Sequence, residues 1–203
     1  MIKTIFQIFY NFGRDIDEFP IYLKSIEMWK DFARSYNMTY LFFTREDCEK
    51  LVKKTKYYEF YQKLSAWSKM ELMRYIIISQ IPNSMYIDLD IQPKNYELFN
   101  YILQNNDCIT GQWNETMSNS IIGFDDNKLI IPFIEFCILE YNRLTSIQVY
   151  KLWKIRKMKR SVGVSAFTKY FKDVKLIVEL PSAIQDHETK EWLNKKYKQV
   201  YYD

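Results

Sequence analysis

The stretch Met85-Tyr86-Ile87-Asp88-Leu89-Asp90-Ile91 decides the fold prediction, because it has the pattern of a buried strand that carries two carboxylates. Side chains alternate between the two faces of a strand, so a spacing of two puts Asp88 and Asp90 on the same side. Two such carboxylates repel each other unless a positive group lies near them, and a divalent cation with oxygen ligands is a natural partner. The alternative is a strand that runs into an acidic turn, since Asp-x-Asp pairs are frequent.

Strand and helix patterns alternate along the whole chain around this stretch. Runs of β-branched and aromatic residues predict strands, and apolar residues spaced by three and four predict helices. Strands are predicted at 2–10, 38–43, 85–91, 107–112, 120–124, 174–178 and 199–202, and helices at 21–36, 54–61, 65–79, 96–103, 130–141 and 164–171. Thr44, with Asp47 three residues later, is typical of the capped start of a further helix.

This order of elements predicts an α/β fold, with a mostly parallel mixed central sheet flanked by helices and a single domain over residues 1–203. Ligands of such folds bind at the carboxyl ends of the strands. The loops after Tyr10 and Phe43 and the acidic pair all lie at such ends, so a candidate site is expected there.

Composition excludes several classes of protein. The chain has 203 residues, is 48% hydrophobic and carries a net charge of +4, which is too mild to indicate a nucleic-acid-binding protein. Its three cysteines show no C-x-x-C spacing, so neither a zinc site nor a disulfide framework follows, and reduced thiols in a cytosol-like compartment are expected. The first ten residues predict a strand and not a signal peptide, and no apolar run is long enough to predict a transmembrane segment.

Polar side chains on three other segments are candidates for the same site. Glu71 and Arg74 stand three positions apart on the helix predicted at 65–79, and they could face the same cleft or form only a surface ion pair. Asn119 begins an apolar strand, where it could bind a ligand or simply make a turn. His187, the one histidine, is a candidate third ligand for manganese, although a histidine in a polar loop is more often without function.

Six short motifs together resemble the DXD-motif glycosyltransferases of the GT-A fold, of the family 32-like group that includes initiating mannosyltransferases and α1,4-galactosyltransferases. In chain order these motifs are Ile5-Phe6-Gln7-Ile8-Phe9, Met70-Glu71-Leu72-Met73-Arg74-Tyr75, Tyr86-Ile87-Asp88-Leu89-Asp90, Asn119-Ser120-Ile121-Ile122, Val162-Gly163-Val164-Ser165, and His187 with Trp192. The resemblance covers roughly residues 1 to 195. Stand-alone domains of this type are encoded by large DNA viruses, so a viral source and action in the host cytoplasm are expected.

The resemblance implies a nucleotide-sugar donor, a UDP-sugar first of all, held with Mn²⁺ or Mg²⁺. Asp90 would bind the metal directly, and Asp88 would bind the metal through water or contact the ribose. His187 would be a third metal ligand or contact a phosphate. Phe9 or Tyr10 would stack on the base.

The resemblance also implies how the sugar would be held and transferred. Arg74 and Glu71 would hold the donor sugar, with Asn119 close to the anomeric centre, and these residues form the expected catalytic group together with the two aspartates. Gln7 and Trp192 are further expected nucleotide-sugar contacts. Transfer to a glycan or glycoprotein acceptor would retain the anomeric configuration through front-face attack by the acceptor hydroxyl.

Several positions depart from the family pattern. Glu71 replaces an aspartate and is one methylene longer, which could change the preferred sugar. Phe6 replaces a histidine, and Phe9 replaces a tryptophan, which weakens stacking on a base. Pro82-Asn83-Ser84 stands where two glycines usually precede the acidic motif. The motif around Gly163 is degraded, so no role is carried over to it.

Two other functions compete with this hypothesis. Phosphatases with an Asp-x-Asp nucleophile pair also place two aspartates at the end of a strand, but usually on the first strand and before a small-residue turn. The basic segment Lys151–Arg160, which contains Trp153, could bind nucleic acid or an acidic membrane surface as a non-catalytic module. A solvated helix or an acceptor-side loop is the simpler interpretation of that segment.

Overall fold

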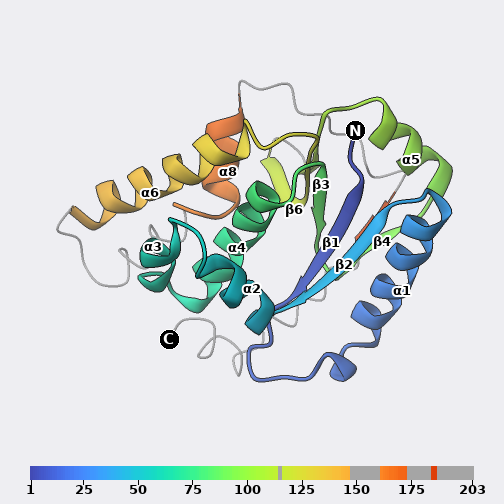
Figure 1. Ribbon diagram of the computed structural model, residues 1–203, viewed down its shortest axis with the longest axis horizontal. Coiled ribbons are helices and arrows are strands. Elements are labelled where there is room, and N and C mark those ends of the chain that lie inside the picture. Colours follow the sequence, from blue (N-terminus) through green and yellow to red (C-terminus); the bar gives the residue numbers. More distant parts are fainter. Residues whose placement is uncertain (114–115, 147–160, 173–183, 187–203) are drawn as a thin grey trace.

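Five strands form one mixed sheet at the centre of the protein (Figure 1). The computed structural model describes residues 1–113, 116–146, 161–172 and 184–186. The strand order is β2 (Thr39–Thr44), β1 (Thr4–Phe9), β3 (Ser84–Ile87), β6 (Thr116–Phe124) and β5 (Cys108–Trp113). β2 and β3 pair with β1 in parallel, whereas β6 pairs with β3 and β5 in antiparallel, so β6 alone runs against the other four. The predicted α/β fold with a mixed sheet is therefore confirmed.

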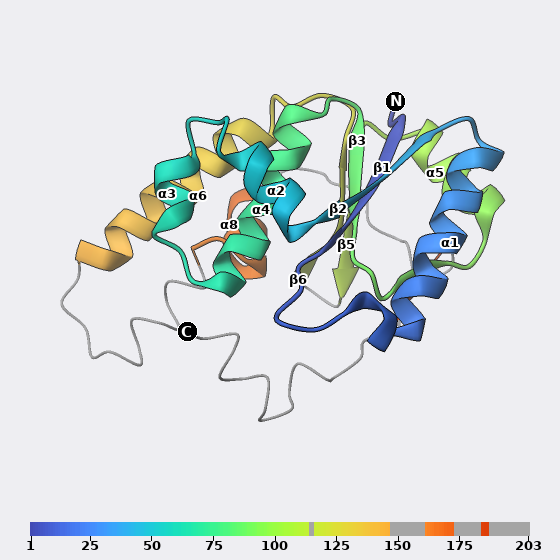
Figure 2. The same ribbon diagram turned by 60° about the horizontal axis from the view of Figure 1, so that its bottom comes forward.

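Helices cover both faces of this sheet, as Figure 2 shows. On one side lie α1 (Pro20–Ser35), which follows the short helix η1 (Ile16–Glu18), and α5 (Tyr96–Gln104). On the other side lie α2 (Arg45–Val52), α3 (Tyr58–Gln62), α4 (Ala66–Gln80), α6 (Ile130–Ser146) and α8 (Val164–Phe171). Each layer buries its own apolar cluster, which is the arrangement that the alternating sequence pattern predicts.

The alternation of side chains along β3 feeds both clusters. Tyr86 belongs to the cluster under α4 and α6, while Met85 and Ile87 belong to the cluster under α1 and α5. α4 leads into this central strand and is itself buried almost all round, from Glu71 to Ser79. A helix so enclosed fixes the direction of its polar side chains, because they have no solvent to turn to.

Local signals placed several element ends correctly. Thr44 caps α2 as predicted, since its hydroxyl accepts from the backbone of Asp47 while the Asp47 carboxylate accepts from Thr44. Ser65 caps α4 in the same way through the backbone N–H of Ser68. The predicted helix at 54–61 is shortened to α3, and the predicted strands at 174–178 and 199–202 lie outside the described residues.

The predicted strand at 85–91 is wrong in its second half. β3 ends at Ile87, and β4 (Ile91–Pro93) belongs to a separate two-stranded sheet with β7 (Ile184–Asp186). Between them a turn is closed by the Ile91 N–H, which donates to the Asp88 carbonyl at 3.2 Å. The alternation of side chains along a strand therefore does not apply to Asp88 and Asp90, because the chain turns between them. Their predicted position on the same side of a strand does not follow.

β6 contains a bulge next to this turn. Thr110 of β5 pairs with Ile122, but the next residue, Gly111, pairs with Ser118, so residues 119–121 have no partner in β5. The Thr110 hydroxyl donates to the Ser118 carbonyl at 2.7 Å and holds the bulge at its start. Such bulges change the direction of a side chain, and this one carries Asn119.

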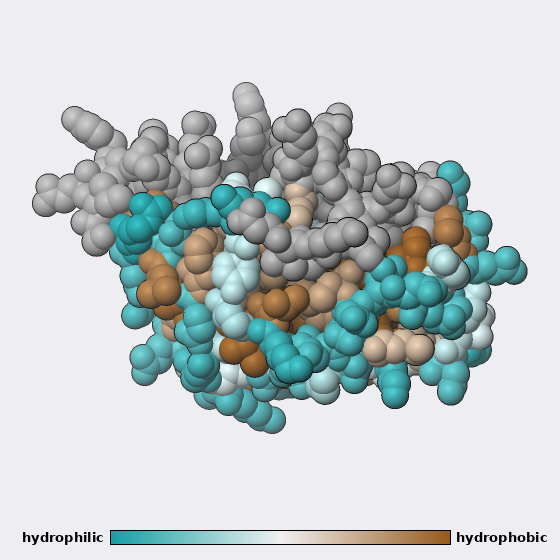
Figure 3. Space-filling model, turned by 90° about the horizontal axis from the view of Figure 1, so that it is seen from above, coloured by the Kyte–Doolittle hydropathy of each residue, from teal (hydrophilic) through white to brown (hydrophobic). Residues whose placement is uncertain are grey.

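The outer surface of the described residues is mostly polar. The large apolar side chains exposed there are Met1, Leu23, Tyr101, Leu139 and Val164. On the face drawn in Figure 3, hydrophobic residues gather near the centre and hydrophilic residues lie around them. No helix within the described ranges combines the length and the apolar character that crossing a bilayer requires.

Candidate functional site

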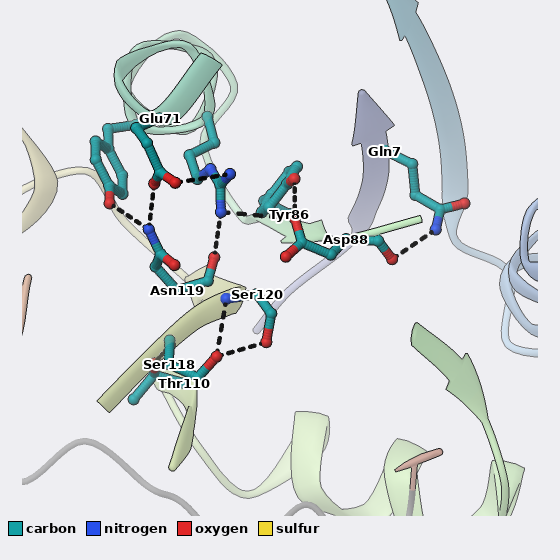
Figure 4. A network of polar contacts seen from close by, with 10 residues as sticks. Gln7, Glu71, Tyr86, Asp88, Thr110, Ser118, Asn119 and Ser120 are labelled. Carbon is teal, nitrogen blue, oxygen red and sulfur yellow. Dashed lines mark hydrogen bonds and ion pairs between the residues drawn. The ribbon is translucent and has the colours of Figure 1, made fainter. Parts of the chain in front are cut away.

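Four polar side chains from three elements meet beside the carboxyl end of β3 (Figure 4). Arg74 of α4 stands at the centre of the group. Its Nη1 donates to the Asn119 carbonyl at 2.8 Å and lies 3.5 Å from Oδ1 of Asp88, while its Nη2 lies 3.6 Å from Oε1 of Glu71. The structure therefore brings together four of the residues that the sequence singled out, from segments up to 48 positions apart.

Glu71 is enclosed by this group. Its Oε2 accepts from the Asn119 amide, which also donates to the Tyr75 hydroxyl at 2.9 Å, and the residue is only 5% exposed. Burial raises the pKa of the Glu71 carboxyl, against the Arg74 charge and the Asn119 hydrogen bond, which lower it. Both Glu71 oxygens thus contact protein groups, and its predicted contact with a donor sugar stays a prediction.

Asp88 is the more accessible carboxylate of the group, with 30% of its side chain exposed. The Tyr86 hydroxyl donates to Oδ1, the same oxygen that lies near Arg74. Burial raises the pKa of the Asp88 carboxyl, while the Arg74 charge and the Tyr86 hydrogen bond lower it. Its backbone N–H donates to the Ser120 carbonyl at 2.7 Å, so the bulge of β6 also fixes the main chain here.

Asp90 lies two residues further along, in the turn, and is half-buried. The chain then enters β4, where Ile91 pairs with Asp186 of β7. His187 directly follows Asp186 in the sequence, but His187 and Trp192 both lie outside the described residues. Within those described residues, no group of three His, Cys, Asp or Glu side chains is arranged to hold a metal ion.

Gln7 is fully buried, although the resemblance implied a contact with the nucleotide-sugar. Its Nε2 donates to the Ser25 hydroxyl at 3.1 Å and to the Asp88 carbonyl at 3.2 Å, and its Oε1 accepts from the Tyr40 hydroxyl at 2.8 Å. The structure therefore places Gln7 beneath the acidic turn, where it supports the backbone of Asp88.

The other end of the turn is held from α1. The Ser25 hydroxyl donates to the Ile91 carbonyl at 2.6 Å, and the Trp29 indole donates to the same oxygen at 2.9 Å. Both residues are fully buried. The turn that carries the two aspartates is thus anchored at both ends by buried side chains, which restricts how far the carboxylates can move.

Phe9 and Tyr10, the candidates for stacking on a base, differ in their exposure. Tyr10 is only 5% exposed and packs against Phe12, with ring centroids 4.8 Å apart, and against Arg45. Phe9 is half-buried at the end of β1, with its ring 6.2 Å from that of Phe19. Of the two, Phe9 has the more accessible ring.

The electrostatic balance of the site is negative. The carboxylates of Glu71 and Asp88 both lie near one guanidinium, that of Arg74, which leaves a formal charge of −1 among these three groups when all are ionised. Carboxylate oxygens are the ligands that Mg²⁺ and Mn²⁺ prefer. Asp88 and Asp90 are therefore the two carboxylates of the turn whose chemistry suits a hard divalent cation.

Some residues of the site were missed in the sequence. Tyr86 belongs to the motif quoted around Asp88, but no role of its own was predicted for it. Tyr75, Ser25 and Tyr40 carry no local signal, because their partners are at least 18 residues away along the chain.

No family model and no curated protein matches this chain. The assignment of the site therefore depends on the order of the motifs and on the contacts of Glu71, Arg74, Asp88 and Asn119. Val162 and Gly163, at the start of α8, are buried and contact none of these four through the interactions described above.

Proposed function

We propose that this protein is a metal-dependent glycosyltransferase that transfers a sugar from a nucleotide diphosphate sugar, with a UDP-sugar as the first candidate, to a glycan or glycoprotein. The observation that carries the proposal is the convergence of Glu71, Arg74, Asp88 and Asn119. The motif order predicted one site for these residues, and their contacts support that prediction. A GT-A type of α/β fold, a cytoplasmic location and a viral source remain expectations from the resemblance.

Asp90 and Asp88 would hold Mn²⁺ or Mg²⁺, with His187 as a third ligand. Support comes from the net negative charge of Glu71, Arg74 and Asp88 when all are ionised, and from the pairing of β4 with β7. That pairing brings the residue before His187 next to the residue after Asp90. Bound there, such a cation would supply positive charge to stabilise a diphosphate leaving group.

The remaining residues would bind and orient the donor. Arg74 compensates the charge of Asp88, whose half-exposed carboxylate can accept a hydrogen bond from a ribose hydroxyl. Asn119 is held through both its carbonyl and its amide, so the bulge of β6 lies at a defined distance from Asp88. Phe9 offers its ring to the base. Trp192 stays a further proposed contact.

Catalysis in this proposal depends on positioning and electrostatics. No described side chain is assigned as a nucleophile. The acceptor hydroxyl would therefore attack the same face of the sugar from which the leaving group departs, and the anomeric configuration would be retained. Holding donor and acceptor in fixed geometry lowers the barrier by converting a bimolecular step into a unimolecular one. The fixed charges of the site add stabilisation of the transition state.

The deciding experiment is a binding and hydrolysis screen of nucleotide-sugars with and without Mn²⁺. Wild type should bind at least one nucleotide-sugar only with the metal, and Asp90→Ala should lose that binding. Asp31→Ala on α1, where the side chain is 58% exposed, is the matched control and should behave like wild type. The proposal fails if no nucleotide-sugar binds with the metal, or if Asp90→Ala binds as wild type does.

The same screen tests the two competing functions. Release of phosphate from generic phosphomonoesters without nucleotide-sugar affinity would indicate an Asp-x-Asp phosphatase. Steeply salt-dependent binding of nucleic acid, with no nucleotide-sugar affinity, would indicate a binding module based on Lys151–Arg160, a segment that lies outside the described residues.

A further inference from the structure

Tyr86 is a buried residue whose side-chain hydroxyl points at a carboxylate of the candidate site. It is 3% exposed, and its hydroxyl donates to Oδ1 of Asp88. The ring is held on two sides, by Phe6 at a centroid distance of 5.6 Å and by the Arg74 guanidinium at 4.6 Å. The hydroxyl therefore sits at a fixed point, since the ring that carries it cannot rotate out of its place.

Arg74 approaches the same oxygen of Asp88. Its Nη1 lies 3.5 Å from Oδ1 and is itself held by the Asn119 carbonyl at 2.8 Å. Among the described residues, the contacts of this carboxylate that we identify are both made at Oδ1. One oxygen of Asp88 is thus directed at the protein, and Oδ2 is the oxygen of the half-exposed group that remains for a ligand.

This one-sided arrangement matters because a free carboxylate rotates easily. The torsion that turns an aspartate carboxylate is broad and roughly two-fold, so without a partner both oxygens exchange places. A group that is already oriented loses less conformational freedom when a ligand binds. Partners of this kind typically change metal affinity by about 10- to 100-fold when they are removed.

We propose that Tyr86 is a positioning residue, which together with Arg74 holds Oδ1 of Asp88 and presents the single oxygen Oδ2 to the divalent cation or to a water of its shell. The proposal rests on the proposed function in so far as Asp88 belongs to a metal-dependent nucleotide site. In this proposal Tyr86 would act through Asp88, because its hydroxyl donates to Oδ1.

The test compares Tyr86→Phe, which keeps the buried ring and removes the hydroxyl, with Tyr96→Phe. The Tyr96 hydroxyl donates to the Met28 carbonyl at 2.8 Å, where α5 meets α1, so the control removes a similar hydrogen bond away from the site. Binding of Mn²⁺ is measured by titration calorimetry with UDP present, and the bound ion by its electron paramagnetic resonance spectrum.

We expect Tyr86→Phe to weaken Mn²⁺ binding about tenfold and to alter the Mn²⁺ spectrum, while Tyr96→Phe changes neither. In an assay of transfer or hydrolysis, the apparent KM for Mn²⁺ should rise, and the KM for the nucleotide-sugar at saturating metal should stay the same. A merely structural role would lower Tm in both variants and leave these metal readouts unchanged, which would overturn the proposal.

Failure of this inference is distinguishable from failure of the proposed function. If wild type binds neither Mn²⁺ nor UDP, the proposed function falls, and the orientation of Asp88 is then tested in the ligand-free protein by the NMR signal of its carboxyl carbon. A shifted or broadened Asp88 signal in Tyr86→Phe, with no change in Tyr96→Phe, supports the positioning role. An Asp88 signal identical to that of wild type overturns it.

Discussion

The side-chain amide of Gln7 donates to the main-chain carbonyl of Asp88 at 3.2 Å, across 81 residues of sequence. This contact joins the centre of β1 to the turn that begins where β3 ends. Because Gln7 is fully buried and also bonds Ser25 and Tyr40, it ties three elements to the acidic turn at one point. The buried side chain of Gln7 thus helps to fix the position of the turn.

Gln7→Leu should therefore destabilise the fold. Leucine has a similar volume, but it leaves the half-buried Tyr40 hydroxyl and the Asp88 carbonyl each without the Gln7 partner, at a cost of up to about 1–3 kcal/mol per group. We expect the free energy of unfolding in urea to fall by about 2–4 kcal/mol. Gln104→Leu, at an exposed position at the end of α5, is the control and should change it by less than about 0.5 kcal/mol. Equal stability of Gln7→Leu and wild type would contradict the supporting role.

Two ion pairs each join an arginine to a carboxylate three residues before it, but one pair is buried and the other is exposed. Arg74 and Glu71 are buried, with side chains 3% and 7% exposed, whereas Arg34 and Asp31 on α1 are 79% and 58% exposed. We expect Arg74→Ala to lower the free energy of unfolding by about 3–5 kcal/mol, because it leaves buried carboxylates uncompensated. Arg34→Ala should lower it by less than about 1 kcal/mol. Chemical unfolding measures the free energy of unfolding of both variants. Similar decreases in the two variants would contradict the expectation that burial makes the Arg74 pair more important.

Arg74 is also expected to matter more for transfer than for nucleotide binding. Its contacts lie with Glu71, Asp88 and Asn119, on the side proposed for the donor sugar. In Arg74→Ala that remains folded, UDP affinity with Mn²⁺ should fall much less than the rate of sugar transfer. An equal loss of UDP affinity, measured by calorimetry, would rule out this assignment.

Glu71 is expected to give the stability of the protein a specific pH dependence. Burial raises the pKa of its carboxyl above the ordinary value of 4.5. Between that value and the folded-state pKa, the folded protein binds more protons than the unfolded chain, so the contribution of Glu71 to stability falls as pH rises. Glu71→Gln cannot titrate and lacks this contribution.

The difference in unfolding free energy between Glu71→Gln and wild type should consequently move in favour of the variant as the pH rises above about 4.5, and should level off above the folded-state pKa of Glu71. Urea unfolding at a series of pH values measures it. Glu59→Gln, at an exposed position on α3, serves as the matched substitution. A difference that does not vary with pH would show that Glu71 titrates alike in the folded and unfolded states.

Addition of metal and nucleotide should stabilise the folded state. At about a hundredfold excess over Kd, a ligand that binds only the folded protein contributes about 2.7 kcal/mol. For a domain of this size that corresponds to a rise in Tm of about 5–10 °C. We expect this rise with Mn²⁺ and UDP together, its reversal by a chelator, and its absence in Asp90→Ala. A rise of the same size in Asp90→Ala would remove Asp90 from the metal site.

Local elements of this protein were predictable because neighbouring residues encode them. The apolar, β-branched and aromatic runs of β1 and β3, the capping pair Thr44 and Asp47 and the spacing of apolar residues in α1 and α5 all act within a few positions of the chain. The motif order also placed Glu71, Arg74, Asp88 and Asn119 in one site. The structure shows these four residues in contact with one another, while their role as a site stays a prediction.

The environment of each side chain was not predictable in the same way. The sequence pattern continued the strand through Asp88 to Ile91, because a turn with no glycine or proline carries no local signal. The bulge that carries Asn119 arises only when β6 pairs with two strands of different register. The second sheet likewise depends on a strand that follows β4 by nearly a hundred residues.

The sequence by itself determined the class of fold, the helices and strands that flank the acidic pair, and the identity of the polar residues at the carboxyl end of β3. Only the tertiary structure decided that Gln7 lies beneath the turn and that Tyr86 and Arg74 share one oxygen of Asp88. The physical reason is the distance along the sequence over which each interaction acts. Periodicity and capping act between neighbours, whereas burial, charge compensation and the direction of a carboxylate depend on groups that only folding brings together.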